Sequence, residues 1–291
     1  MDLLYEIGIA VAFLYMLLSA IEVTLAKHLV KKLGNYNFSI MVLGIGIAPL
    51  LAYALISGSG GISETTLLLS VAAGGLSGAA YIIYYRGLES QQMTNVAALV
   101  EVQTVLLFIF GVFILGEGMN FIDIIGIFAI FIGAVLVMTT KGMKLNVLLI
   151  PVIIAEVLWA AQWVLLNYAI GSYGGSALPV LIVRVMAAVL VGAYVLGLKK
   201  VDRTAHMPKG KVQIYALVLV VLIIGFIDGS TNAMFGFVVK ENLVAIGSAI
   251  YATMPIIAAL FGRIIYKDRL SWAQKAGLIL AVAGAIAIGL G

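Results

Sequence analysis

The sequence predicts an all-α integral membrane protein with ten transmembrane helices arranged as two inverted five-helix repeats. Composition, the length of the apolar stretches and the similarity of the two halves predict this class. The 291-residue chain is 64% hydrophobic and 10% charged, with a mean hydropathy of +1.19. A soluble domain is about a quarter charged. The apolar stretches are too long for transmembrane β-strands and do not alternate as such strands do.

Ten stretches are long enough to cross the hydrocarbon core as helices, which takes about 20 apolar residues. The loops between them are short, and the longest polar stretch runs from Lys199 to Lys211. No loop can hold a soluble domain, so functional residues are expected within the spans. The predicted spans cover residues 5–27, 36–57, 65–87, 93–115, 120–140, 145–170, 176–198, 213–238, 243–266 and 271–290.

The distribution of Lys and Arg predicts the orientation in the cell membrane. Fifteen of the 17 basic residues lie in loops that follow odd-numbered spans, whereas the other loops carry only Lys240. The positive-inside rule then makes the odd loops cytoplasmic and both termini extracytoplasmic. The same rule explains the net charge of +4, so no nucleic-acid partner is expected. The N-terminus lacks a basic leader region, so the first span is expected to be retained.

The two halves, residues 1–142 and 143–291, align when one is shifted by 151 residues. Because each half holds five spans, the second half runs through the membrane in the opposite direction. Inverted repeats are typical of alternating-access transporters with a site near the bilayer midplane. The regular Gly spacing favours close approach of helix backbones. The aligned residues are Ala98 with Ala249, Phe110-Gly111 with Phe261-Gly262, Glu117 with Asp268, Gly126 with Gly277 and Gly133-Ala134 with Gly284-Ala285.

The segment Leu115-Gly116-Glu117, with the Gly-rich stretch Gly126 to Ala134 after it, resembles the hallmark of the drug/metabolite transporter superfamily. In that pattern a Gly-Glu turn joins two helices. The segment Tyr266 to Leu270 resembles a degenerate second copy, in which Lys267-Asp268 replaces Gly-Glu. Ten spans in two five-span repeats match the EamA-like branch, and the resemblance covers nearly the whole chain.

A second resemblance lies within the second half. Ile154-Ala155-Glu156-Val157 resembles the start of the first helix of small multidrug resistance exporters, and Ala245 to Gly262 with Lys267 to Leu270 resembles their last two helices. In those proteins the glutamate binds protons and cationic drugs in turn. This resemblance implies that Glu156 is the first candidate for a proton site.

Four acidic residues and one basic residue lie deep within apolar stretches: Glu22, Glu101, Glu156, Asp228 and Arg184. Ionisable residues within spans are costly and usually face a bundle interior or an aqueous path. One arginine can neutralise one acid, so the others are left to bind a proton or a cation. Either Glu101 or Asp228 is expected to pair with Arg184, which could instead receive a substrate carboxylate. Glu22 has a second possibility, which is to reach the membrane surface near Lys27.

Trp159 and Trp163 follow Glu156 by three and seven residues and share its helix face. An acid between indole rings can hold a cation by charge and cation–π attraction. The structural alternative is a protonated, hydrogen-bonded carboxyl with packed tryptophans. Asn232 after Asp228 and Tyr251 in span 9 complete the candidate site. Tyr81, Tyr84 and Tyr85 at the end of span 3 favour an interfacial belt, and the alternative is that one of them lines a cavity. Glu117 and Asp268 lie in turns, which favours helix capping or loop pairing.

These features predict a secondary active transporter that exchanges protons for a small organic metabolite, an amino acid or an amine-bearing solute, and exports it. It is expected to be a monomer in the lipid bilayer, to need no cofactor beyond a proton gradient, and to hold no metal site. A single deep base disfavours phosphorylated substrates. A passive facilitator, an exchanger or a cation channel with the same acidic path remains the alternative. The sequence carries no His cluster, nucleophile motif or phosphate loop, so an enzyme is not expected.

Overall fold

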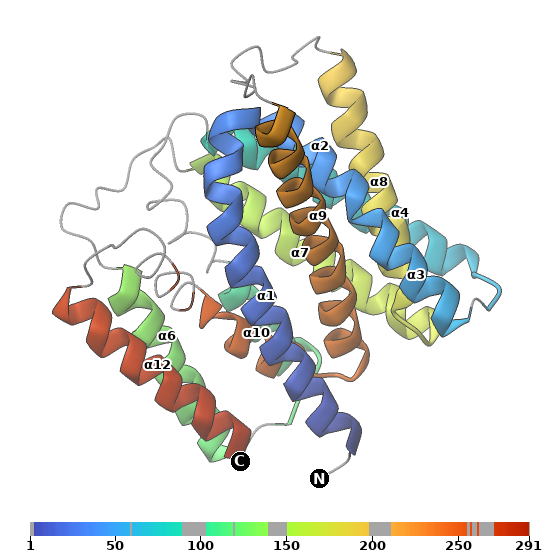
Figure 1. The fold of residues 1–291 in the computed structure, drawn as a ribbon. Coiled ribbons are helices and arrows are strands. Elements are labelled where there is room, and N and C mark those ends of the chain that lie inside the picture. Colours follow the sequence, from blue (N-terminus) through green and yellow to red (C-terminus); the bar gives the residue numbers. More distant parts are fainter. Residues whose placement is uncertain are drawn as a thin grey trace.

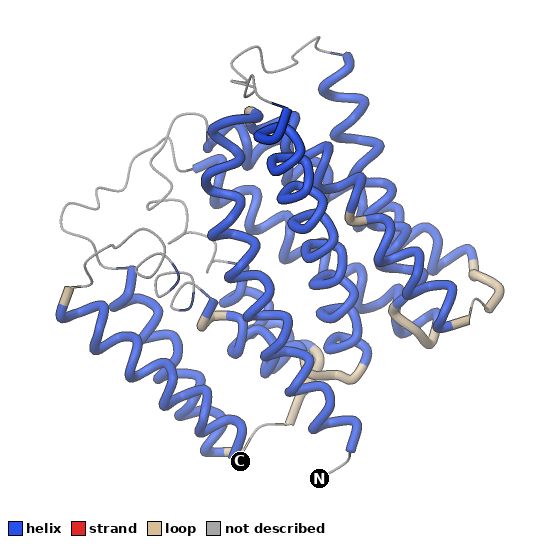
Figure 2. Tube along the Cα trace, in the orientation of Figure 1, coloured by secondary structure: helices blue, strands red, loops and turns tan. Residues whose placement is uncertain are grey.

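A computed structural model of the chain describes residues 3–58, 60–88, 103–118, 120–138, 150–197, 211–254, 257, 261 and 271–290. Within these ranges the secondary structure consists of helices and connecting loops, with no strand (Figure 2). The helices form a bundle in which the start of α1 and the end of α12 lie at the same end (Figure 1). The all-helical part of the predicted fold class is therefore confirmed.

The first half of the chain begins with the long helix α1 and continues through an interrupted second helix to α4. A further helix spans Gln103–Ile114 and finishes in the π-helical turn η1. The bounds are α1 Leu3–Leu33, α2 Asn35–Ile45, α3 Ile47–Ser57, α4 Glu64–Leu88, η1 Phe110–Ile114 and α6 Phe121–Met138.

The second half contains three long helices, α7, α8 and α9, followed by the short α10 and by α12. α10 begins directly after a tight turn at the end of α9, in which Asn242 has a φ of 57°. The bounds are α7 Ile150–Tyr173, α8 Ala177–Gly197, α9 Lys211–Lys240, α10 Val244–Tyr251 and α12 Trp272–Leu290.

Six helical segments are long and apolar enough to cross a membrane: Leu3–Ala26, Tyr36–Ser57, Glu64–Tyr84, Ile153–Tyr173, Ala177–Gly197 and Gln213–Lys240. Each lies within or close to a predicted span. Two shorter apolar helices, Gln103–Ile114 and Phe121–Gly133, lie in two other predicted spans. The total of ten spans and the inverted relation of the halves stay predictions.

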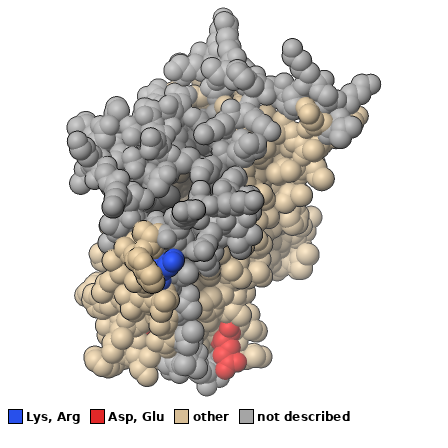
Figure 3. Space-filling view, turned by 60° about the vertical axis from the view of Figure 1, so that its left-hand side comes forward, with Lys and Arg blue, Asp and Glu red and all other residues tan. Residues whose placement is uncertain are grey.

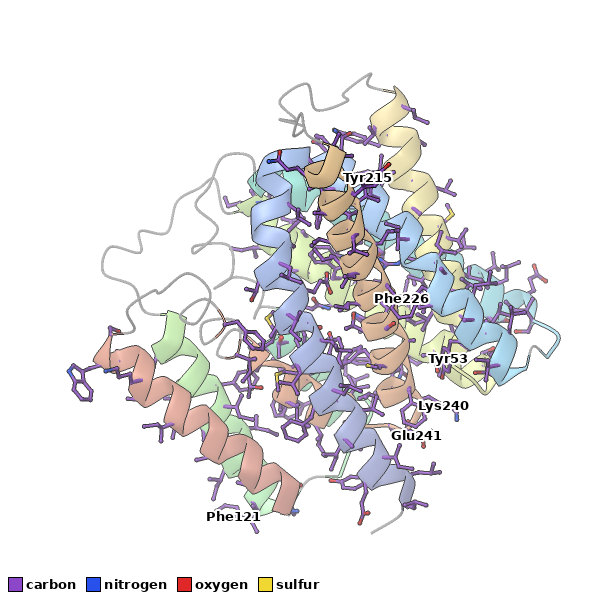
Figure 4. The ribbon with its side chains drawn as sticks, in the orientation of Figure 1. Tyr53, Phe121, Tyr215, Phe226, Lys240 and Glu241 are labelled. Atoms are coloured by element: carbon purple, nitrogen blue, oxygen red, sulfur yellow. The ribbon has the colours of Figure 1, made fainter. Side chains whose placement is uncertain are left out.

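The outer surface of the bundle is apolar. Phe226 and Tyr215 on α9 point outward and are 57% and 73% exposed (Figure 4). On the face in Figure 3, the described surface carries one basic and one acidic patch and is otherwise uncharged. A soluble monomer rarely exposes apolar patches of this size. The exposed apolar side chains therefore fit contact with lipid.

The second span is one predicted stretch but two helices, α2 and α3, separated at Gly46. Pro49 explains the interruption. Its ring takes the space next to the Ile45 carbonyl, and it has no N–H to donate to that oxygen. The carbonyl end of α2 therefore meets the start of α3 in the middle of the bundle (Figure 1).

The two halves of the chain pack against each other along most of their helices. α4 lies along α7 and α8, α1 and α2 lie along α9, and α6 lies along α12. Glycines allow the closest of these contacts: a Cβ at Gly284 of α12 would collide with the carbonyl oxygen of Gly126 on α6. This confirms that glycines of the predicted repeat bring helix backbones together.

Candidate site at a buried ion pair between helices

An ion pair between Arg184 of α8 and Asp228 of α9 lies inside the bundle. The two residues are only 5% and 7% exposed. Arg184 Nη1 also donates a hydrogen bond of 3.5 Å to the hydroxyl oxygen of Tyr81 on α4. The site therefore joins two helices of the second half to one helix of the first half.

The interruption between α2 and α3 lies directly against this ion pair. A Cβ at Gly46 would be 2.6 Å from Arg184 Nη2, so the guanidinium would have to shift to make room for any side chain there. On the other side, a Cβ at Gly229 would collide with the Gly46 carbonyl oxygen and would lie 2.6 Å from Pro49. Two glycines thus let the backbones of two helices approach beside a buried charge pair.

Glu22 of α1 is close enough to Arg184 for the two charges to interact. Asp228 is the direct partner of the arginine, and Glu22 lies within reach of its charge. The alternative, in which Glu22 reaches the membrane surface near Lys27, stays a prediction. One base between two acids leaves the cluster with a surplus of negative charge when both acids are ionised.

Glu156 on α7 is completely buried. Trp159, one turn further, contacts Tyr81 at 5.1 Å and Tyr84 at 5.2 Å between ring centroids. Tyr81 and Tyr84 are half-buried and pack on the Trp159 ring, and the interfacial belt for these tyrosines stays a prediction. Tyr81 connects the surroundings of Glu156 with those of Arg184, since it touches both Trp159 and Arg184.

Trp163, the next turn of α7, belongs to a second group of rings that we call the aromatic cluster: Trp163, Phe235, Tyr15 and Tyr251. Trp163 meets Phe235 of α9 edge-on at 4.5 Å. Phe235 lies 5.2 Å from Tyr15 of α1, and Tyr15 stacks on Tyr251 of α10 at 4.7 Å. Four helices from both halves therefore meet in this cluster.

Comparison with known proteins now places the chain. The sequence profile of the EamA-like transporter family matches it twice, over residues 6–139 and 146–290. The chain belongs to the EamA-like transporter family. No curated protein matches it. A solved structure titled only "Crystal structure of protein" superposes with a TM-score of 0.73, over 97% of this chain and 96% of its own, at 17% identity. That likeness concerns the fold.

Membership of the EamA-like family confirms the resemblance drawn from Leu115-Gly116-Glu117 and its degenerate second copy. The members of this family are membrane transporters of the drug/metabolite type, which agrees with the expectation of a transporter. The double match agrees with the internal similarity detected at a shift of 151 residues.

Within this family member, the predicted site residues separate into two groups. Arg184, Asp228 and Glu22 come together, and Trp163 and Tyr251 belong to the aromatic cluster. Asn232 donates a hydrogen bond of 2.8 Å to the backbone carbonyl of Asp228, one turn before it on α9. Glu101, Asp268 and Pro255 lie outside the described residues.

The family's Gly-Glu turn has the capping role that was predicted for it. The Glu117 carboxyl oxygens accept hydrogen bonds of 2.7 Å from the backbone N–H groups of Val244 and Ala245, at the start of α10. Burial raises the pKa of Glu117 to about 7, although the two hydrogen bonds act in the opposite direction. Three residues later, Asn120 and Asp123 cap the start of α6 reciprocally, with bonds of 3.0 and 2.9 Å.

Gly46, Pro49 and Gly229 were not among the predicted site residues. The signal for the first two was present, because Gly-x-x-Pro within an apolar stretch predicts an interrupted helix. Gly229 directly follows Asp228. A glycine next to a deep carboxylate is a sign of close backbone approach at that charge.

Proposed function

We propose that the protein is a secondary active transporter that moves an amino acid or an amine-bearing solute across the cell membrane by alternating access. Proton coupling and export are part of the proposal. The observation that carries it is the buried Arg184–Asp228 pair at the α2–α3 interruption. Family membership supports the general function, and the chemistry of this cluster supports the class of substrate.

The cluster offers complementary groups to a small charged solute. The guanidinium of Arg184 has donor nitrogens for a carboxylate, whereas Asp228 and Glu22 attract an ammonium group. Doubly charged phosphate esters would need several cations, and within the described spans Arg184 is the buried one. An amino acid or amine is therefore the best fit to these charges.

Proton coupling is assigned to the deep carboxyls, with Glu156 first. It is completely buried within a span, and a deep carboxyl that binds a proton or a cation in turn suits this role. Trp159 and Trp163 lie on its face and would stabilise a bound cation through their ring faces. Its likeness to the glutamate of small multidrug resistance exporters adds support, and Glu101 and Glu22 are further candidates.

Alternating access is supported by where the cluster lies. Arg184 and Asp228 come from the second half of the chain, whereas Tyr81 and Gly46 come from the first. Rocking of one five-helix repeat against the other would change access to this point from each side. With ten spans, the Lys and Arg bias puts both termini outside the cell. A monomer suffices for such a path.

The test is a pH measurement inside proteoliposomes while amino acids, polyamines or quaternary cations are added outside. We expect one class to move protons, and we expect Glu156→Gln to abolish this movement. Glu64→Gln at the exposed start of α4 is the matched control and should behave like wild type. Equal proton movement in Glu156→Gln would remove Glu156 from the mechanism.

The same assay distinguishes the alternative function. A passive facilitator, exchanger or channel would move solute without proton movement and could not accumulate it against a gradient. The direct Arg184–Asp228 contact favours this alternative in one respect. A substrate with both charges could replace the internal pair without any proton. Accumulation driven by a pH gradient alone would exclude the alternative.

A further inference from the structure

Glu117 is a half-buried acid that the proposed transport cycle does not use. Its two carboxyl oxygens are occupied by Val244 and Ala245, which follow it by 127 and 128 residues. The first N–H groups of any helix lack partners within that helix. At α10 the preceding residue, Leu243, has no side-chain group to cap them. The first half of the chain thus supplies the cap for a helix of the second half.

The backbone around Glu117 fixes it in this position. Gly116 has a φ of 67°, which ends the preceding helix. The N–H of Glu117 then donates to the Gly111 carbonyl oxygen at 3.1 Å. Gly111 itself lies against α10, because a Cβ there would be 2.7 Å from the Ala245 nitrogen. Two contacts, one polar and one of bare backbone, therefore hold the same end of α10.

α10 carries the last ring of the aromatic cluster. Residues 244–250 of this helix are buried, and Tyr251 at its end stacks on Tyr15. Tyr15 in turn lies beside Phe235, which touches Trp163. The start of α10 lies at the end of the bundle that also holds the start of α6, marked by Phe121, and the end of α9, marked by Lys240 and Glu241 (Figure 4). A shift of α10 would open the cluster towards that end.

We propose that Glu117 is a positioning residue for transport. It holds the start of α10 in place, and α10 in turn positions Tyr251 in the aromatic cluster. The contact between Glu117 and α10 must break for that end of the bundle to open. The inference rests on the proposed alternating access. Asp123 is the natural comparison, since it is a buried carboxyl of the same loop region that caps only its own helix.

The chain contains no cysteine, so one introduced thiol can report the seating of α10. Ser248 of α10 is 1% exposed and differs from cysteine by one atom. The rate at which a polar maleimide labels Ser248→Cys in the purified full-length protein is the readout. Ser70→Cys on α4, a second fully buried serine position, reports general loosening.

We expect Glu117→Ala to raise the labelling rate at Ser248→Cys by about tenfold or more, because the two hydrogen bonds to the start of α10 are lost. Glu117→Gln keeps one acceptor and should give an intermediate rate. Asp123→Ala should leave the rate unchanged, and Ser70→Cys should stay slow in every variant.

A second variant keeps the test open if Glu117→Ala does not fold. Gly111→Ala retains the carboxyl group but forces the backbone of α10 away, so it should also raise labelling at Ser248→Cys. Unchanged labelling in the folded variants, or an equal rise at Ser70→Cys, would overturn the proposal. The assay needs neither substrate nor proton gradient, so failure of the proposed function would show only in the vesicle experiment.

Discussion

Arg184 and Asp228 depend on each other, because each is a charge placed in an apolar interior. Removing one partner leaves the other buried and uncompensated, which costs about 3–5 kcal/mol, whereas replacing both with apolar residues is often neutral. We therefore expect Arg184→Met or Asp228→Leu alone to lower stability by this amount. The double variant should recover the stability but not the transport. Thermal unfolding in detergent and uptake into vesicles measure the two effects.

The pair of Lys240 and Glu241 is the control for this prediction. It is an ion pair of 3.2 Å with Lys240 40% exposed, and exposed pairs contribute about 0–1 kcal/mol. Lys240→Met should therefore change stability little. A double variant at Arg184 and Asp228 that transported normally would show that the buried pair is structural only.

At the residue scale, the sequence named the members of the candidate site and limited the partner of Arg184 to Glu101 or Asp228, without deciding between the two. A deep acid in an apolar stretch is visible in the sequence, and Asp228, Glu22 and Arg184 were all found in this way. Which acid meets Arg184 depends on how helices pack, and the pattern within one span carries no such information. The contact of Tyr81 with Trp159 was likewise not predictable, since the two residues lie on different helices.

At the scale of the element, the interruption between α2 and α3 brings backbone next to the ion pair. Gly46→Ala would place a Cβ 2.6 Å from Arg184 Nη2. Overpacking of this kind costs about 1–3 kcal/mol, and it would displace the guanidinium from Asp228. We expect this variant to lose transport while keeping its helical content. Circular dichroism and vesicle uptake are the measurements.

Gly44→Ala, two residues earlier, provides the comparison. A Cβ at Gly44 meets nothing within 4 Å, so this change should leave transport intact. It should keep or slightly raise stability, since alanine favours helix over glycine by about 0.5–1 kcal/mol. Equal behaviour of the two variants would contradict a specific role for Gly46.

Element positions were predictable because hydropathy is a local property. The span predicted at 176–198 coincides with α8, Ala177–Gly197, within one residue at each end. The sequence prediction missed the interruption of the second span, because it used only the length and apolarity of the stretch and not the helix-breaking effect of Pro49. The family resemblance came from an equally local signal, the Gly-Glu turn, whereas the partner of Glu117 lies 127 residues away along the chain.

At the scale of the whole molecule, the two halves are connected by α1 and α2 on α9, by α4 on α7 and α8, and by α6 on α12. The sequence predicted the duplication, and the family profile matches both copies. It could not predict how the copies interlock, because repeat similarity says nothing about which helices of one copy face the other. Glu117 makes a polar contact between the two halves, and burial raises the pKa of its carboxyl to about 7.

This titration predicts how stability depends on pH. The pKa of Glu117 is raised from 4.5 to about 7 in the folded protein, so its neutral form is favoured by folding. Its contribution to stability is then complete below pH 4.5, declines as the pH rises, and is lost above about pH 7. A pKa shift of this size corresponds to a change in the free energy of unfolding on the order of 3 kcal/mol.

The difference in unfolding temperature between wild type and Glu117→Gln, measured from pH 4 to 9, isolates this contribution from that of other acids. We expect wild type to lose stability relative to Glu117→Gln as the pH rises through this range. A difference that stayed constant with pH would mean that the hydrogen bonds from Val244 and Ala245 fully offset burial, and that Glu117 is ionised throughout.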